Sequence, residues 1–271
     1  MNFHRGFHAF HWIRGQEYDA YRTRLPVNRR LEDHVNDSYD AHWRGLVLQY
    51  LKNIDAWSEP EDYPCCRTMD TALEWLEANR SDQPKFLWID TFQNHEPWCP
   101  PARFDRYVPK DYKGPKIIMP KGGNALSWGD EGTIACVRGL YAGDVAYVDW
   151  CLGRLFDGMR RLGYMENSLI CVLSDHGHPL ADHGKFLKGA DRMYSELLKV
   201  PLIMRFPGGE YGGKRLDALA QFPDLPVTWL DAIGHAAAAR RACSMSTVRS
   251  SLSFMRSVPF TIERRTSFPL R

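Results

Sequence analysis

The strongest pattern along the chain is an apolar stripe between residues 134 and 162. Its apolar side chains recur every three or four residues, which predicts one long amphipathic helix with Gly163 as its stop. The stripe comprises Ile134, Val137, Tyr141, Val145, Val148, Leu152, Leu155, Met159 and Leu162. Shorter helices are predicted over residues 40–52 and 66–79. In the second of these, Asp70 and Glu74 lie toward the N-terminal half, where the helix dipole favours anions.

Three short apolar runs indicate buried strands. They cover residues 85–91, 169–173 and 200–204, and the second follows directly after the long helix. Strands that alternate with helices predict an α/β fold with a mostly parallel sheet flanked by helices, in which ligands bind at the carboxyl ends of the strands. The first 40 residues lack a sustained period and are expected to form surface loops around short elements.

The composition favours a globular protein, with 44% hydrophobic and 25% charged residues in 271. No apolar run approaches the roughly 18 to 20 residues that cross a bilayer, and the first residues are too polar for a signal-peptide core. The chain as it stands is therefore expected to be cytoplasmic, with no membrane partner, while the localisation of any longer parent is left open. Seven cysteines without a C-x-x-C pair favour reduced, buried thiols.

The character of the chain changes after Gly234. Residues 235–271 hold seven Arg, no Lys and one Glu, a charge of +6, so the preceding 234 residues carry +2 minus +6, or −4. We expect a basic, poorly ordered tail. Nucleic-acid binding by this tail is the alternative, but the tail has no recognisable motif, and no nucleic-acid partner is expected.

The clearest candidate for chemistry is Ser174-Asp175-His176-Gly177, directly after the predicted strand at 169–173. A carboxylate and an imidazole at a strand end can bind a divalent cation in the cleft there, and the alternative is a simple polar turn. Asp182-His183-Gly184 follows, and then Lys185 and Lys188. A loop of this kind supplies cations to an oxyanion beside the metal.

A second candidate, His95, follows the predicted strand at 85–91. The end of that strand brings it within reach of the same cleft, where it can serve as an acid or as a donor to a leaving-group oxygen. The alternative is an ordinary loop histidine.

The order of these motifs resembles the sulfatase branch of the alkaline phosphatase superfamily, from about residue 3 to residue 234. An early segment, Gly6-Phe7-x5-Ile13-Arg14-Gly15-Gln16-Glu17, and a late one, Gln221 to Asp231, look like that family too. Between them stand Ile89-Asp90-x4-His95-x-Pro97-Trp98, then Tyr141-x5-Tyr147-Val148-Asp149, then Ser174-Asp175-His176-Gly177 and Ala181-Asp182-His183-Gly184, and finally Lys188. Several motifs in a fixed order are far more specific than any one of them.

The resemblance implies a role for each matching position. Asp175 and His176 look like the second pair of ligands of the catalytic cation, which is calcium in most sulfatases, with manganese or zinc as the alternatives. Lys188 looks like the lysine that binds the oxygens of the transferred group, and His95 looks like the histidine that assists the leaving group. The implied reaction is hydrolysis of a small-molecule sulfate ester, and phosphate or phosphonate ester hydrolysis is the runner-up. His183 receives no role, and the oligomeric state stays open.

Two parts of the family's site have no counterpart in the sequence. The first pair of metal ligands is usually two consecutive aspartates near the N-terminus, and no such pair occurs upstream of residue 90. The family's nucleophile is a cysteine in C-x-P-S-R, and the nearest match, Cys99-Pro100-Pro101-Ala102-Arg103, is best explained as accidental. We therefore expect residues 1–234 to form a partial sulfatase-like domain, a fragment with impaired or no activity. A non-catalytic remnant that binds a cation or an anion is the competing hypothesis.

Overall fold

The structure is a computed structural model and describes residues 4–235 and residue 238. The chain divides into two compact units. The first runs to Glu166 and also includes Val172–Ile203, and the second comprises Asn167–Cys171 and the chain from Met204 onward. The predicted basic tail from residue 235 falls almost entirely outside the described residues.

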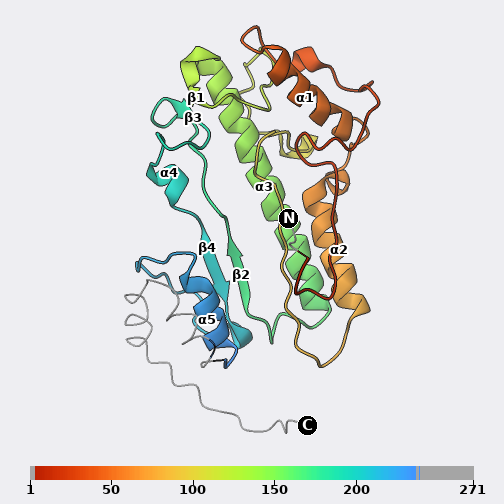
Figure 1. Cartoon of the computed structure of the whole chain (residues 1–271), viewed down its shortest axis with the longest axis vertical. Coiled ribbons are helices and arrows are strands. Elements are labelled where there is room, and N and C mark those ends of the chain that lie inside the picture. Colours follow the sequence, from red (N-terminus) through yellow and green to blue (C-terminus); the bar gives the residue numbers. More distant parts are fainter. Residues whose placement is uncertain (1–3, 236–237, 239–271) are drawn as a thin grey trace. The chain divides into compact units, whose positions relative to one another are not determined.

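The first unit is organised by the predicted long helix, α3, which spans Glu131–Arg161 (Figure 1). The helix begins three residues before the apolar stripe because the Asp130 carboxylate caps it, accepting a hydrogen bond of 2.7 Å from the Thr133 amide. It ends at the predicted stop, where Gly163 has a φ of 82°, a left-handed conformation that glycine adopts freely.

Two further helices pack near α3 in this unit (Figure 1). The helix α1 spans Ala41–Ile54 and α2 spans Pro64–Ala78, so both predicted helices are confirmed within two residues at each end. One core cluster lies around α1 and the first half of α3, and a second lies between α2 and the second half of α3. The first includes Val47, Leu51, Ile54, Trp98, Ile118, Val137 and Phe186, and the second includes Cys65, Cys66, Met69, Phe104, Tyr147, Cys151 and Leu155.

The described strands are short and lie in two two-stranded sheets. The strands β1 (Gly123–Asn124) and β3 (Lys185–Phe186) are antiparallel, with Gly123 opposite Phe186. The strands β2 (Ile170–Leu173) and β4 (Leu202–Arg205) form the other sheet and match the predicted runs at 169–173 and 200–204. Helices together with these short sheets agree with an incomplete α/β fold.

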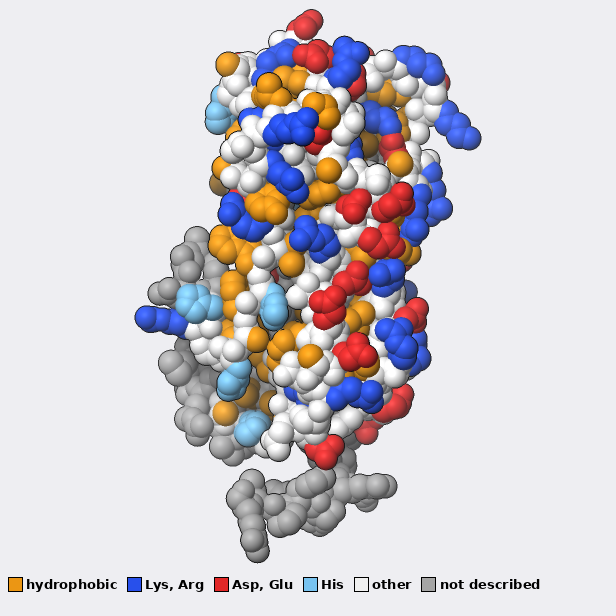
Figure 2. Space-filling view, turned by 90° about the vertical axis from the view of Figure 1, so that its right-hand side faces the viewer, with side chains coloured by type: hydrophobic (Ala, Val, Ile, Leu, Met, Phe, Trp, Pro, Cys, Tyr) orange, Lys and Arg blue, Asp and Glu red, His pale blue; other side chains and the backbone are white. Residues whose placement is uncertain are grey.

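The predicted strand at 85–91 is wrong as secondary structure. The segment is extended, but no described strand pairs with it, and a strand exists only where a neighbour completes its hydrogen-bond ladder. Phe86 and Trp88 are 64% and 57% exposed, so the run is not buried either. Figure 2 shows apolar side chains at the surface on one face of the molecule.

The remaining elements are short. In the first unit, α4 spans Ser195–Leu198, and single 3-10 turns cover Leu31–Asp33, Pro60–Asp62, Ala102–Phe104 and Ala125–Ser127. The second unit contains the turn Pro207–Gly209 and the helix α5, Asp224–Ala232. No helix within the described residues combines the length and the apolar character that crossing a membrane requires. The six described cysteines are free thiols, as predicted, and five of them are buried.

Candidate active site

Two of the predicted site residues meet in the first unit. His95 follows the extended segment at 85–91, and Lys188 lies just after β3. Their side chains are in contact, with Lys188 Nζ 2.5 Å from His95 Nε2. Segments separated by 93 positions in the sequence thus deliver an ammonium and an imidazole to one point.

The other ring nitrogen of His95 faces oxygen acceptors. His95 Nδ1 lies 2.8 Å from Glu17 Oε1 and 2.8 Å from the Glu96 carbonyl oxygen. Because both of these atoms are acceptors, Nδ1 carries the proton, and Nε2 of the neutral ring accepts the hydrogen bond from Lys188. Burial lowers the pKa of His95, but the hydrogen bond to Glu17 and the charge of Glu96 outweigh it, so that the pKa is raised above 6.5.

The predicted metal pair follows β2. Asp175 Oδ2 lies 3.6 Å from His176 Nε2, and His176 Nδ1 donates a hydrogen bond of 2.8 Å to the Gly177 carbonyl. That bond leaves the Nε2 lone pair free for a ligand, which is the usual arrangement of a metal-binding histidine. Asp175 is 85% exposed at its side chain.

This pair fits part of a coordination shell. A carboxylate oxygen and an imidazole nitrogen at this separation suit two neighbouring positions around one divalent cation. Within residues 4–235, however, no group of three or more His, Cys, Asp or Glu side chains converges on a common point. Asp175 and His176 therefore stay a predicted pair, and the described residues add no third ligand.

His178 joins the two halves of the site and was missed in the sequence. Its ring centroid lies 5.5 Å from that of His176 and 6.1 Å from that of His95. The side chain is only 6% exposed, and its Nε2 lies 3.6 Å from Glu96 Oε2. Burial, with the nearby positive charge of Lys188, lowers the pKa of His178 to about 3, so the ring is neutral. The His-x-His spacing of residues 176 and 178 after a strand is the sequence signal that could have indicated it.

The other basic residues of this loop have partners elsewhere. His183 Nε2 lies 2.9 Å from Glu196 Oε1, and its ring stacks on Tyr194 with centroids 3.8 Å apart. Lys185 pairs with Asp191 at 2.8 Å. Among His183, Lys185 and Lys188, only Lys188 contacts His95.

Cys99, the accidental match to the nucleophile motif, lies in the core. It is 8% exposed, and burial raises the pKa of its thiol to about 11. A reactive cysteine needs a lowered pKa and access to solvent. Residues Ala102–Phe104 form only a three-residue 3-10 turn, so no α-helix N-terminus faces an anion at this point. These observations favour an inert structural thiol.

Comparison with known proteins identifies the family. A family model described as "Sulfatase" matches residues 2–235. The chain is 27% identical over 193 residues to an arylsulfatase of Clostridium perfringens, covering 65% of this chain and 39% of that protein. It is 32% identical over 106 residues to the multifunctional alkaline phosphatase superfamily protein PehA of Trinickia caryophylli, covering 39% of this chain and 20% of that protein.

A solved structure of the phosphonate monoester hydrolase of Agrobacterium radiobacter superposes with a TM-score of 0.44 at 21% identity, over 55% of this chain and 34% of that one. The chain thus spans less than half the length of each of these three proteins. The match to the family model covers more than four fifths of the chain, and with it the predicted family and fold class are confirmed. The chain belongs to the sulfatase family, with the α/β fold of the alkaline phosphatase superfamily.

Proposed function

We propose that the chain serves in sulfate-ester hydrolysis and supplies the side chains that hold the sulfuryl group and assist the leaving group. Lys188 binds the sulfuryl oxygens, and His95 donates a hydrogen bond or a proton to the leaving-group oxygen. Asp175 and His176 are two ligands of a divalent cation, with calcium first and manganese or zinc as alternatives. The observation that carries the proposal is the contact between Lys188 Nζ and His95 Nε2.

The charges of this pair suit the reaction. A sulfate ester carries negative charge on its non-bridging oxygens, and more charge develops on the leaving oxygen as the ester bond breaks. While the His95 ring is neutral, the three N–H groups of Lys188 allow it to keep its bond to His95 while it donates to a sulfuryl oxygen. The pKa of His95 is raised, which favours the imidazolium form, in which Nε2 carries a proton for the leaving-group oxygen. In that form Nε2 no longer accepts from Lys188, so the contact between the two side chains belongs to the neutral ring and all three N–H groups of Lys188 can face the sulfuryl oxygens.

The cation has a separate task. When bound, it neutralises charge on the transferring group and activates the nucleophile as a Lewis acid. The described residues contribute the Asp175 carboxylate and the His176 Nε2 lone pair toward it, and the hydrogen bond to the Gly177 carbonyl fixes the orientation of that imidazole. Further ligands are required for tight binding, because two protein ligands hold a cation weakly.

Two alternatives keep specific support. Hydrolysis of phosphate or phosphonate esters would use the same lysine and histidine on a similar tetrahedral anion, and one relative is described as multifunctional. Binding of a cation or an anion without turnover is supported by the buried thiol of Cys99, whose raised pKa makes it a poor nucleophile.

The test measures turnover of an aryl sulfate, a phosphate diester and a phosphonate monoester side by side, with calcium, manganese or zinc added. We expect Lys188→Ala and His95→Ala each to lower the sulfate rate by about 10²-fold or more, as is usual for a lost acid catalyst or charged donor. Lys185→Ala is the matched control. It removes the same charge from a lysine three residues away, which pairs with Asp191 and not with His95.

A second measurement covers the case without turnover. Inorganic sulfate is titrated into the protein by calorimetry, and we expect Lys188→Ala to weaken binding by about tenfold or more, because a hydrogen bond from a charged donor contributes about 1.5–3 kcal/mol. Sulfate binding without turnover would favour the non-catalytic reading. Binding and turnover that are the same in Lys188→Ala and in Lys185→Ala would contradict the role of Lys188 altogether.

A further inference from the structure

Glu17 reaches His95 from a distant part of the chain, and neither the sequence motifs nor the proposed function gives it a role. Glu17 Oε1 lies 2.8 Å from His95 Nδ1. The two side chains are 21% and 27% exposed, so this is a partly buried pair and not a freely solvated one. It is also the shorter of two carboxylate contacts to this nitrogen, since Glu96 Oε2 lies 3.5 Å away.

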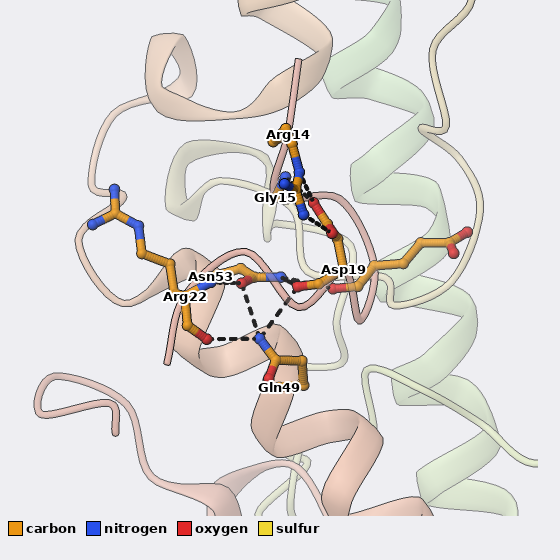
Figure 3. Close-up of polar contacts among 7 residues, drawn as sticks. Arg14, Gly15, Asp19, Arg22, Gln49 and Asn53 are labelled. Atoms are coloured by element: carbon orange, nitrogen blue, oxygen red, sulfur yellow. Dashed lines mark hydrogen bonds and ion pairs between the residues drawn. The ribbon is translucent and has the colours of Figure 1, made fainter. Parts of the chain in front are cut away.

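The segment that carries Glu17 is tied to helix α1 by a polar network (Figure 3). At its centre is Asn53, which is 2% exposed. Asn53 Nδ2 donates to the carbonyls of Asp19, at 2.8 Å, and of Glu17, at 3.3 Å, and its Oδ1 accepts from the Arg22 amide. Gln49, one turn earlier on α1, donates to the Asp19 and Arg22 carbonyls. A buried amide therefore fixes the path of the backbone at Glu17 and over the residues that follow it.

The start of the segment is closed by an ion pair. The Arg14 guanidinium contacts both carboxylate oxygens of Asp19, at 2.5 and 2.9 Å, and the Gly15 amide donates to the same carboxylate (Figure 3). Residues 14–19 thus form a closed turn that holds Glu17 within it. The bidentate geometry makes this closure directional.

The backbone of Glu17 itself is unusual. Its φ is 48°, in the left-handed region of backbone conformation that residues other than glycine rarely adopt. A non-glycine residue adopts that conformation only where its surroundings stabilise it. Here the Asn53 side-chain amide does so by donating a hydrogen bond to the Glu17 carbonyl. Strained residues of this kind concentrate at functional sites.

We propose that Glu17 is a positioning residue for His95: its carboxylate fixes the proton on Nδ1, and so directs Nε2 toward Lys188 and the leaving-group oxygen. This inference rests on the proposed function for the meaning of His95, but the geometry of the pair is independent of it. In this proposal Glu17 acts through His95 and is given no direct role on the reacting atoms. It acts on the orientation and charge of the imidazole, in the way that a carboxylate orients a catalytic histidine.

The titratable side chains around the His95 ring are known, which makes the effect measurable. Glu17 and Glu96 face Nδ1, Lys188 faces Nε2, and His178 lies edge-on at 6.1 Å. The carboxylates favour the imidazolium, and the ammonium opposes it. Removal of the Glu17 charge therefore lowers the pKa of His95 and weakens its preference for the Nδ1–H tautomer.

The test is ¹⁵N NMR of the histidine rings in the whole chain. We expect wild-type His95 to show the Nδ1–H tautomer, and we expect Glu17→Gln to lower its pKa by about one unit, a tenfold loss of proton affinity. Glu61→Gln is the control, because that carboxylate carries the same charge but pairs with Arg154. Glu17→Asp, which keeps the charge on a shorter arm, is expected to recover part of the pKa. An unchanged pKa and tautomer in Glu17→Gln would overturn the inference.

Turnover separates this inference from the proposed function. If His95→Ala abolishes sulfate hydrolysis but Glu17→Gln changes neither the NMR parameters nor the pH profile, the positioning role is wrong and the function stands. If Glu17→Gln shifts the pKa of His95 while His95→Ala leaves turnover intact, the positioning role stands and the proposed function is wrong. We expect Glu17→Gln to reduce kcat more than it changes KM, with the pH profile shifted toward lower pH.

Discussion

Tyr147 provides the most direct test of how the helices of the first unit are held together. The residue lies on α3 and is fully buried. Its hydroxyl donates to the Pro60 carbonyl at 2.8 Å and accepts from the Cys66 amide at 3.1 Å. Cys66 is the third residue of α2, whose N-cap, Tyr63, makes no side-chain hydrogen bond to the helix. The hydroxyl of Tyr147, from the neighbouring helix α3, therefore caps the N-terminus of α2.

The change Tyr147→Phe removes that oxygen and little else. The ring keeps its packing, but the Cys66 amide and the Pro60 carbonyl both lose a partner in the interior. The Pro60 carbonyl keeps its hydrogen bond from the Tyr63 amide, at 3.4 Å, so only the Cys66 amide is left unsatisfied. An unsatisfied buried polar group costs about 1–3 kcal/mol, and we expect the free energy of unfolding to fall by that amount. The assay is urea denaturation followed by tryptophan fluorescence, in which the midpoint should fall while the slope stays the same.

Tyr141→Phe is the matched control for this prediction. Tyr141 lies on the same helix and packs its ring on Trp98 with centroids 5.2 Å apart, but its hydroxyl makes no hydrogen bond with the described residues. We expect this variant to stay within about 0.5 kcal/mol of the wild type. If both variants unfold at the same urea concentration, the hydroxyl of Tyr147 is not a cap and the reasoning is refuted.

Three further outcomes follow from single residues. Cys99, with a pKa of about 11, should react with iodoacetamide at pH 8 roughly 200-fold more slowly than a free cysteine, and rapid labelling in the native protein would contradict its burial. Gly143→Ala should destabilise by about 1–3 kcal/mol in urea denaturation, because its Cβ would lie 2.7 Å from the Phe104 carbonyl oxygen. Gly153→Ala on the same helix meets nothing within 4 Å and should stabilise by about 0.5–1 kcal/mol in the same assay. The pKa of His178 is about 3 in the folded protein and near 6.5 in the unfolded chain, so the unfolded chain takes up a proton first as the pH falls. The free energy of unfolding should therefore decrease from pH 6.5 downward, by about 2 kcal/mol at pH 5. His178→Gln should remove this pH dependence.

The helices were predictable because their apolar period is a local property. The apolar stripe from 134 to 162 predicted the buried face of α3. The helix begins three residues earlier than the stripe because Asp130 caps it, and a cap is not part of the apolar period. The run at 85–91 failed for the opposite reason. Its composition favours a strand, but a strand depends on a neighbour in the ladder, and the described chain provides none for it.

The candidate site was predictable in part, because some of its residues belong to local sequence motifs. The order of the family's motifs indicated His95 and Lys188, and the two side chains lie in contact. Glu17 was not accessible to this reasoning, because its approach to His95 depends on a closed turn and on a buried amide from α1. His178 belonged to a visible motif, but only its packing between two other imidazoles distinguished it from a loop residue.

The extended segment at 85–91 bears on how the protein behaves in a test tube. Phe86 and Trp88 present large apolar surfaces, 64% and 57% exposed, on an extended segment that is not part of either of the two sheets among the described residues. Such a segment is a template on which strands from other molecules add, and apolar, weakly charged β-formers are the typical seeds of aggregates. Low protein concentration, or a charged residue introduced next to Leu87, is expected to reduce this aggregation. Either measure would keep the protein dispersed while turnover is assayed.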